Sequence, residues 1–85
     1  MRVRFTNRYV AQCRKIPSSI RERAEKQLRL LLQNPQHPSL RLHKMRGYTN
    51  MWEISVTIHY RIMFQIEGDE YVLLKIGPHD VLDKH

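Results

Sequence analysis

The stretch WEISVTIHYRIMFQIEGDEYVLLKIGPHD, residues 52–80, decides the fold of this 85-residue chain. It holds three runs rich in Ile, Val, Phe and Tyr, and turn-forming residues separate them. Apolar residues recur at even positions, with polar residues mainly between them, as in strands that bury one face. These even positions are Trp52, Ile54, Val56, Tyr60, Ile62, Phe64, Ile66, Val72, Leu74 and Ile76. The stretch therefore predicts an antiparallel meander of three strands.

The same alternation constrains how the strands pair, because a slip of one residue would send every side chain to the opposite face. A three-residue turn at residues 57–59 sets Ser55 beside Arg61. A turn centred on Gly68 gives the further pairs Ile66–Val72, Met63–Lys75 and Arg61–Gly77.

This register gathers a polar cluster near one end of the sheet. Arg61, Lys75 and His79 all fall on the odd-numbered face of the predicted sheet. They are two cations and a titratable imidazole. We predict that this cluster forms the functional site.

The composition favours a polyanionic partner. Fifteen Lys and Arg residues outnumber eight Asp and Glu residues, which gives a formal net charge of +7. Such an imbalance is typical of proteins that bind RNA, DNA, an acidic protein or an anionic membrane. A basic surface that serves solubility alone is the alternative. The length predicts one domain, residues 1–85, with a small core.

The sequence argues against several classes of protein. No apolar run approaches the roughly 20 residues of a membrane span, and MRVRFTNRY lacks a signal peptide's apolar segment. Cys13 has no partner for an internal disulfide, which suits a reducing cytoplasm. No Cys/His spacing resembles a zinc site, and no glycine-rich phosphate-binding loop is present. We expect a cytoplasmic protein without metal, cofactor or membrane partner.

A strand and a short helix are predicted at the start of the chain. Residues 2–5 alternate, with Val3 and Phe5 apolar. Thr6 or Asn7 can then cap a helix whose apolar positions are Tyr9, Val10, Cys13 and Ile16. We interpret Cys13 as a small core residue there, because no catalytic partner lies at an arguable position.

A second, longer helix is predicted after Pro17. Residues 19–22, Ser-Ile-Arg-Glu, match a capping box, and Asn34 before Pro35 ends the helix. The apolar stripe consists of Ile20, Ala24, Leu28, Leu31 and Leu32. The two helices are expected to form a hairpin over the apolar face of the sheet. The basic outer face of the second helix could contact nucleic acid or membrane, or simply be solvated.

The densest mixture of cations, aromatic residues and glycine lies between this helix and the meander. Residues 40–42, Leu-Arg-Leu, alternate like the start of another strand, and His43-Lys44-Met45-Arg46-Gly47-Tyr48 follows. Cations neutralise phosphates and an aromatic ring can stack on a base, so the segment suits contact with the phosphates and bases of a nucleic acid.

The predicted fold class is α+β. A small antiparallel sheet, made of a meander of three or four strands plus the N-terminal strand, carries the helical hairpin on one face. The opposite face is expected to be partly open and to carry the odd-numbered cluster.

The chain resembles the RelE/ParE superfamily of bacterial toxins over essentially its whole length. The resemblance rests on the order of the elements, on HPSLRLHKMRG at residues 37–47, on WEISVTIHYRIMFQIEGDEYVLLKIG at residues 52–77 and on the closing GPHD. More narrowly, it is similar to the RelE-type and YafQ-type ribosome-dependent messenger-RNA endonucleases. The resemblance implies a RelE-like microbial-ribonuclease fold, and a type II toxin–antitoxin system. It also implies an acidic antitoxin partner, assembly with that antitoxin into a heterotetramer, and messenger RNA in the ribosomal A site as substrate.

The resemblance also implies roles for individual residues. Arg61 stands where RelE-type toxins place an arginine that stabilises charge on the scissile phosphate. His79 matches the histidine that YafQ-type toxins use as a general acid or base. With Lys44 these residues are the predicted catalytic group. The predicted RNA-binding residues are Arg46, Lys75, His43, Arg41, His59 and Tyr48.

One strand departs from the RelE pattern. RelE carries lysines on the strand matched by residues 52–57, where this chain has Glu53 and Ser55, and RelE's tyrosine beyond the last strand has no counterpart after Asp80. A histidine-assisted mechanism is therefore expected in place of a lysine-driven one. Asp80 is interpreted as a cap of the last turn or as a residue that orients His79.

The expected chemistry is cleavage of RNA by its own 2′-hydroxyl. Histidine suits the proton transfers because its ordinary pKa of about 6.5 leaves both forms accessible, and His43 and His59 are further candidates for this role. Arginine suits the charged transition state.

Several alternatives stay open. Arg61 could simply pair with Glu53, and His79 could lie in a cap or an exposed turn. At the level of function, a non-catalytic ParE-like gyrase inhibitor and an inactive RNA-binding homologue are the alternatives.

Overall fold

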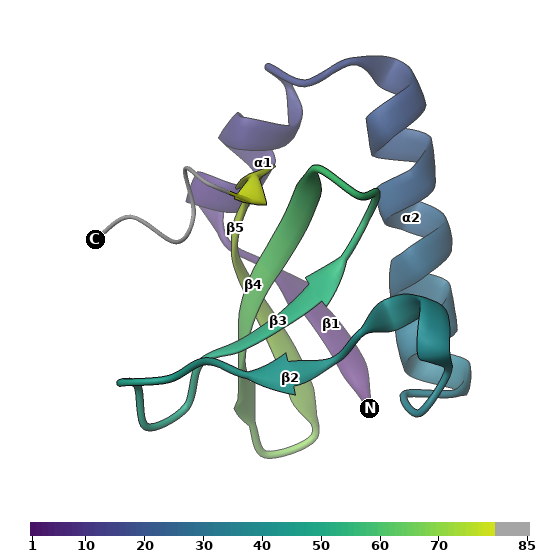
Figure 1. Cartoon of the computed structure of the whole chain (residues 1–85). Coiled ribbons are helices and arrows are strands. Elements are labelled where there is room, and N and C mark those ends of the chain that lie inside the picture. The colour runs from purple at the N-terminus through teal and green to yellow at the C-terminus, as the bar shows by residue number, and fades with distance from the viewer. Residues whose placement is uncertain (80–85) are drawn as a thin grey trace.

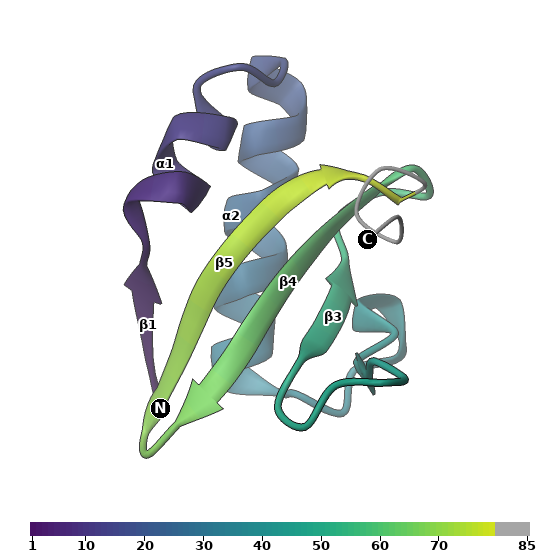
Figure 2. The ribbon, with the colours of Figure 1, turned by 90° about the vertical axis from the view of Figure 1, so that its left-hand side faces the viewer.

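A computed structural model describes residues 1–79 of the chain (Figure 1). Its elements are, in order, β1 (Arg2–Phe5), α1 (Asn7–Cys13), α2 (Ser18–Gln33), the 3₁₀ turn η1 (Pro38–Leu40), β2 (His43–Lys44), β3 (Trp52–Ser55), β4 (Tyr60–Glu67) and β5 (Glu70–Pro78). The strands form one sheet in the order β1-β5-β4-β3-β2, in which β1 runs parallel to β5 and the other neighbours are antiparallel. Both helices lie on the same face of this sheet (Figures 1 and 2), which confirms the α+β class and the helical hairpin. The sheet is mixed and not wholly antiparallel as predicted, because β1 joins it parallel to β5.

The start of α1 is confirmed, and the start of α2 differs from the prediction. Thr6 Oγ1 accepts a hydrogen bond from the Tyr9 amide at 3.2 Å and donates one to the Leu73 carbonyl at 2.7 Å, so the cap also ties α1 to β5. In contrast, α2 begins at Ser18 with Pro17 as its N-cap, and no side chain caps it. The predicted capping box is therefore wrong, because the proline, with φ fixed at −57°, sets the entry geometry instead.

One face of α2 packs on the sheet. Ala24, Leu28 and Leu31 are buried as predicted, whereas Leu32, assigned to the same stripe, is exposed. The stripe also includes the buried Gln27, whose Nε2 donates to the carbonyls of Ser39 at 3.3 Å and Ser55 at 3.0 Å. These two bonds satisfy the amide inside the core and fix α2 against β3.

The core lies between the helices and the sheet. From β3 and β4 it takes Ile54, Ile62 and Phe64, as the alternation predicts. From β5 it takes Tyr71 and Leu73 together with Ile76, whereas the prediction had Val72 and Leu74 with Ile76. The assignment of Val72 and Leu74 to the helix-covered face is therefore wrong.

A β-bulge in β5 accounts for this difference. Across the Gly68–Asp69 turn, where Gly68 has φ +59°, Ile66 pairs with Tyr71 and not with the predicted Val72. Leu74 is then an extra residue, and beyond it the pairs Met63–Lys75 and Arg61–Gly77 form as predicted. The bulge thus restores the predicted register at the end of the hairpin where Arg61 lies.

The segment before β2 is not a strand. Pro38 opens η1, Leu40 is fully buried, and Arg41 has a left-handed backbone with φ 48°. An extended strand cannot continue through that conformation, so the strand predicted from residue 40 is wrong. The strand β2 begins at His43 and pairs with β3.

Within residues 1–79, no helix is both long and apolar enough to cross a membrane.

Candidate active site

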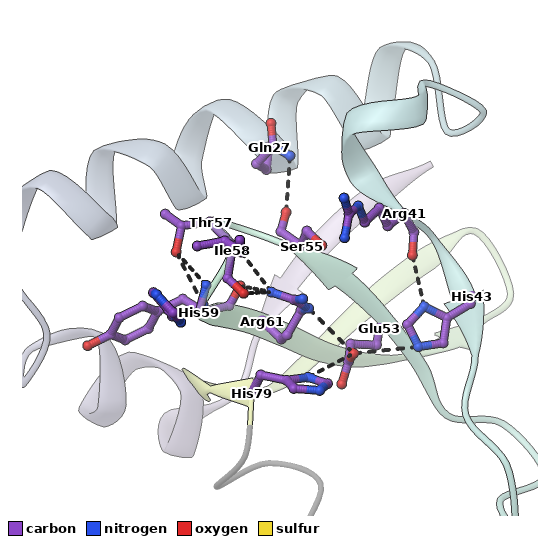
Figure 3. A network of polar contacts seen from close by, with 11 residues as sticks. Gln27, Arg41, His43, Glu53, Ser55, Thr57, Ile58, His59, Arg61 and His79 are labelled. Atoms are coloured by element: carbon purple, nitrogen blue, oxygen red, sulfur yellow. Dashed lines mark hydrogen bonds and ion pairs between the residues drawn. The ribbon is translucent and has the colours of Figure 1, made fainter.

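Within residues 1–79, three basic side chains converge on the carboxylate of Glu53 (Figure 3). Glu53 Oε1 lies 3.5 Å from His43 Nε2, 3.8 Å from Arg61 Nε and 4.0 Å from His79 Nδ1. We call these four residues the Glu53 cluster. The Glu53 side chain is 2% exposed, while the side chains of His43 and His79 are 53% and 50% exposed. A buried carboxylate thus underlies two accessible imidazoles.

The strand register produces this arrangement. His43 pairs with Glu53 across β2 and β3, and Arg61 pairs with Ser55 on one side and with Gly77 on the other. The His79 amide donates to the His59 carbonyl at 2.7 Å, which ties the end of β5 to the β3–β4 turn. Because Ile54 and Ile62 face the helices, Glu53 and Arg61 face the opposite side of the sheet. We call this side the far face.

The far face is not exposed throughout. Met63 and Val72 lie on it, away from the helices, and both are buried. The expectation of a partly open face therefore holds for the end that carries His43 and His79, and not for the middle of the hairpin.

Arg61 is held tightly by the backbone. Its Nη1 donates to the carbonyls of Thr57 at 2.7 Å, Ile58 at 3.1 Å and Tyr60 at 3.2 Å, and its side chain is 11% exposed. These bonds fix the β3–β4 turn and place the guanidinium beside Glu53. Within residues 1–79, Nη2 makes no hydrogen bond, so this nitrogen remains as a donor for an oxyanion.

The two histidines are oriented differently. His43 Nδ1 lies 2.8 Å from the Arg41 carbonyl and Nε2 faces Glu53, so both ring nitrogens face acceptors. His79 turns Nδ1 towards Glu53, which directs the Nε2 side of its ring away from the carboxylate. A carboxylate that holds one imidazole nitrogen sets the orientation from which the other nitrogen transfers a proton.

The other predicted site residues lie outside the Glu53 cluster. Lys44 is exposed on β2, with Nζ 6.0 Å from the centre of the Trp52 ring. Lys75 is half-buried on β5 opposite Met63. The remaining predicted site residues are exposed and lie in the flanking loops and turns: Arg41, Arg46, Tyr48 and His59. The interpretation of Asp80 lies outside the described residues.

A phenol and a thiol, titratable groups of a different chemistry, lie on the helical side of the sheet. Burial raises the pKa of the Tyr9 phenol, and contact with Cys13 adds to the effect. Burial also raises the pKa of the Cys13 thiol. Because a thiol with a raised pKa is a poor nucleophile at neutral pH, Cys13 fits the core role expected of it.

The central position of Glu53 was not predicted. The sequence suggested that Glu53 could neutralise Arg61 or act as a base, but the contact with His43 depends on where β2 begins. The predicted strand from residue 40 gave no indication of that contact. Within the described part of the chain, no three His, Cys, Asp or Glu side chains are arranged to hold a metal ion.

The comparisons with known proteins agree with the fold and with the resemblance. The sequence profile of the ParE toxin of type II toxin–antitoxin systems (parDE) matches residues 3–81. The chain belongs to this toxin family. No curated protein matches its sequence.

Three solved structures illustrate the similarity of this toxin's fold to that of other toxins. YafQ from E. coli strain BL21(DE3) has a TM-score of 0.79 at 9% identity, covering 95% of this chain and 96% of that one. A chain of the RelB–RelE antitoxin–toxin complex from Methanococcus jannaschii has a TM-score of 0.74 at 21% identity, covering 96% and 98%. The YoeB/ParE toxin from Agrobacterium tumefaciens has a TM-score of 0.77 at 13% identity, covering 93% and 99%. These similarities confirm the RelE-like fold.

Proposed function

We propose that this toxin cleaves messenger RNA on the ribosome, without a metal ion, by attack of the RNA's own 2′-hydroxyl on the adjacent phosphate. The proposal is carried by the Glu53 cluster, in which a guanidinium and two imidazoles lie within 4.0 Å of one carboxylate oxygen. The reaction needs a proton acceptor, a proton donor and a fixed cation, and these three groups supply them.

Each member of the cluster has a role in this proposal. Arg61 stabilises the negative charge of the transition state through Nη2, because Nη1 is already bound to the β3–β4 turn. His79 takes or gives a proton. His43 is the proposed second proton-transfer group, and in that role its Nδ1 exchanges the Arg41 carbonyl for the RNA. Glu53 orients both imidazoles from below. Lys44, Arg46 and Lys75 contribute electrostatic attraction to RNA.

The decisive experiment is a ribosome-programmed cleavage assay with His79→Ala and Arg61→Ala. Each substitution should lower the rate of messenger-RNA cleavage by about 10²-fold or more, because it removes a proton-transfer group or a preorganised cation. Cleavage of naked RNA should be weak, since the small surface relies on the ribosome to align the substrate.

Arg4→Ala provides the matched control for this assay. Arg4 is half-exposed on β1, where it pairs with Glu67 and Glu70, so its loss removes one positive charge away from the cluster. The control should stay within about twofold of the wild-type rate. Equal rates for wild type, His79→Ala and Arg61→Ala, with the fold preserved by circular dichroism, would overturn the proposal.

A non-catalytic ParE-like gyrase inhibitor is the second candidate. The match to the ParE profile favours it, and so do the three bonds by which Arg61 supports a turn, since they give that residue a structural role. A gyrase inhibitor should tolerate His79→Ala, block supercoiling by purified gyrase, and cause DNA damage in cells. A ribonuclease should arrest translation instead.

An acidic antitoxin is the proposed partner in either case. The net charge of +7 favours a negatively charged partner. Similar toxins form complexes with the antitoxins RelB and DinJ, which supports the same kind of assembly here, including a heterotetramer, in the cytoplasm.

A further inference from the structure

We infer that a pocket beside the Glu53 cluster binds one nucleotide of single-stranded RNA adjacent to the scissile phosphate. The inference rests on the proposed function, because it extends the path of the same RNA strand. We call this cavity the flanking pocket; Arg23 and Gln27 of α2, Arg41, Ser55 and Ile58 line it.

Ser55, one of the residues that line the flanking pocket, carries a buried hydroxyl that is not satisfied within residues 1–79. Ser55 is 8% exposed, and its Oγ has no hydrogen-bond partner within residues 1–79. Burying a hydroxyl without a partner costs free energy, so such groups in native proteins call for an explanation. A ligand that hydrogen-bonds to this hydroxyl would remove the cost.

Two arginines also line the flanking pocket. Arg23 Nε donates to the Val56 carbonyl at 3.3 Å, which fixes the side chain and leaves its Nη atoms for a ligand. The second arginine, Arg41, directly follows η1 and has a left-handed backbone. Neither arginine forms an ion pair with a carboxylate of the described residues. The pocket therefore offers two cations that no carboxylate of residues 1–79 pairs with, which suits a phosphate group.

The size and the apolar rim point to a nucleotide and not to phosphate alone. The cavity has a volume of about 250 Å³. Since a water molecule occupies about 30 Å³ of liquid, this is room for roughly eight waters. Ile58 stands at the rim with 76% of its surface exposed and can cover one face of a base. Proteins recognise single-stranded RNA by holding unstacked bases against apolar groups or guanidinium planes.

The flanking pocket shares its walls with the Glu53 cluster (Figure 3). The carbonyls of Thr57 and Ile58, two residues that line the pocket, accept the hydrogen bonds of Arg61 Nη1. The carbonyl of Arg41 contacts His43 Nδ1. A strand whose phosphate contacts Arg61 would therefore place a neighbouring nucleotide at Arg23 and Ser55.

Binding of a non-cleavable RNA trinucleotide, 2′-O-methylated at each residue, tests the inference by NMR titration of the full chain. Arg23→Ala and Ser55→Ala should each weaken binding about tenfold, by loss of a charged or a buried hydrogen bond. Arg29→Ala is the matched control, because it removes the same charge from the same helix outside the pocket, and it should change affinity by less than about twofold. Ser55→Ala should unfold at the same temperature as wild type or higher, since its hydroxyl has no partner to lose within residues 1–79.

The outcomes separate this inference from the proposed function. Equal affinities for Arg23→Ala, Ser55→Ala and Arg29→Ala would overturn the pocket even if the wild type cleaves messenger RNA. The expected losses of affinity in a chain that cleaves no messenger RNA would support the pocket and overturn the nuclease. If inorganic phosphate alone shifts the Gln27 side-chain amide and the Arg23 Nε signals as the trinucleotide does, the pocket is a simple anion site and the nucleotide assignment is wrong.

Discussion

The two ends of the β4–β5 hairpin carry charged groups in very different surroundings. Near the Gly68 turn, Arg2 pairs with Asp69 at 3.3 Å and Arg4 pairs with Glu67 at 3.4 Å, and at least half of each of these side chains is exposed. At the other end, Glu53 is buried and faces three basic groups. Exposed pairs contribute little to stability, whereas a buried carboxylate is unfavourable unless cations compensate it. The buried Glu53 and its basic partners are expected to add little net stability to the fold, so we attribute this arrangement to function.

The largest effect that distinguishes the two ends is expected for Glu53→Gln. The substitution keeps the shape but removes the anion beside Arg61 and should lower the free energy of unfolding by about 2 kcal/mol. Glu67→Gln, the same change in an exposed pair, should cost less than about 0.5 kcal/mol. Urea unfolding of both variants measures the difference, and equal losses would show that burial does not separate the two ends.

A third environment, the helical side of the sheet, sharpens the comparison at high pH. Because burial raises the pKa of Tyr9 above its ordinary value of 10.0, the unfolded chain releases this proton first as pH rises. Stability should therefore fall above about pH 10, and Tyr9→Phe should reduce the fall between about pH 9 and pH 11 by about 1 kcal/mol. Urea unfolding across this range tests it. Parallel pH profiles for wild type and Tyr9→Phe would contradict the expectation.

The smallest expected effect concerns salt. Arg4→Ala should cost about 0.5 kcal/mol at low ionic strength and almost nothing in about 1 M NaCl, where the screening length is about 3 Å. The cost of Glu53→Gln should persist in the same salt, because buried charges are screened much less. Thermal unfolding of both variants at the two salt concentrations is the measurement. A salt-sensitive Glu53→Gln would mean that water and ions reach this carboxylate in solution.

Periodicity predicted most of the fold because the strands and helices bury regular faces. The alternation from Trp52 to Ile66 fixed the core side of β3 and β4, and the spacing of Ala24, Leu28 and Leu31 fixed the buried side of α2. The bulge could not be predicted in the same way. Leu73 and Leu74 are equally apolar, so no pattern of polarity shows which of them leaves the ladder.

The site was predicted in part for the same reason. Parity alone placed Arg61 and His79 on one face, and the structure brings both to the Glu53 carboxylate. The contribution of His43 depends on the short strand β2, whose start is set by the left-handed backbone of Arg41. A left-handed non-glycine residue is uncommon, and neither composition nor periodicity shows where one will occur.

The bulge residue Leu74 divides the β4–β5 hairpin into two short ladders, one on each side of the bulge. Removing one residue at this position would leave the pairs on both sides aligned, with Gly77 still opposite Arg61. Losing one residue within Tyr60–Met63 would instead exchange the inner and outer faces of that ladder and turn its guanidinium towards the helices. Tolerance to a length change in this hairpin is therefore concentrated at the bulge, and the geometry of the end that carries the Glu53 cluster is insulated from changes near the Gly68 turn.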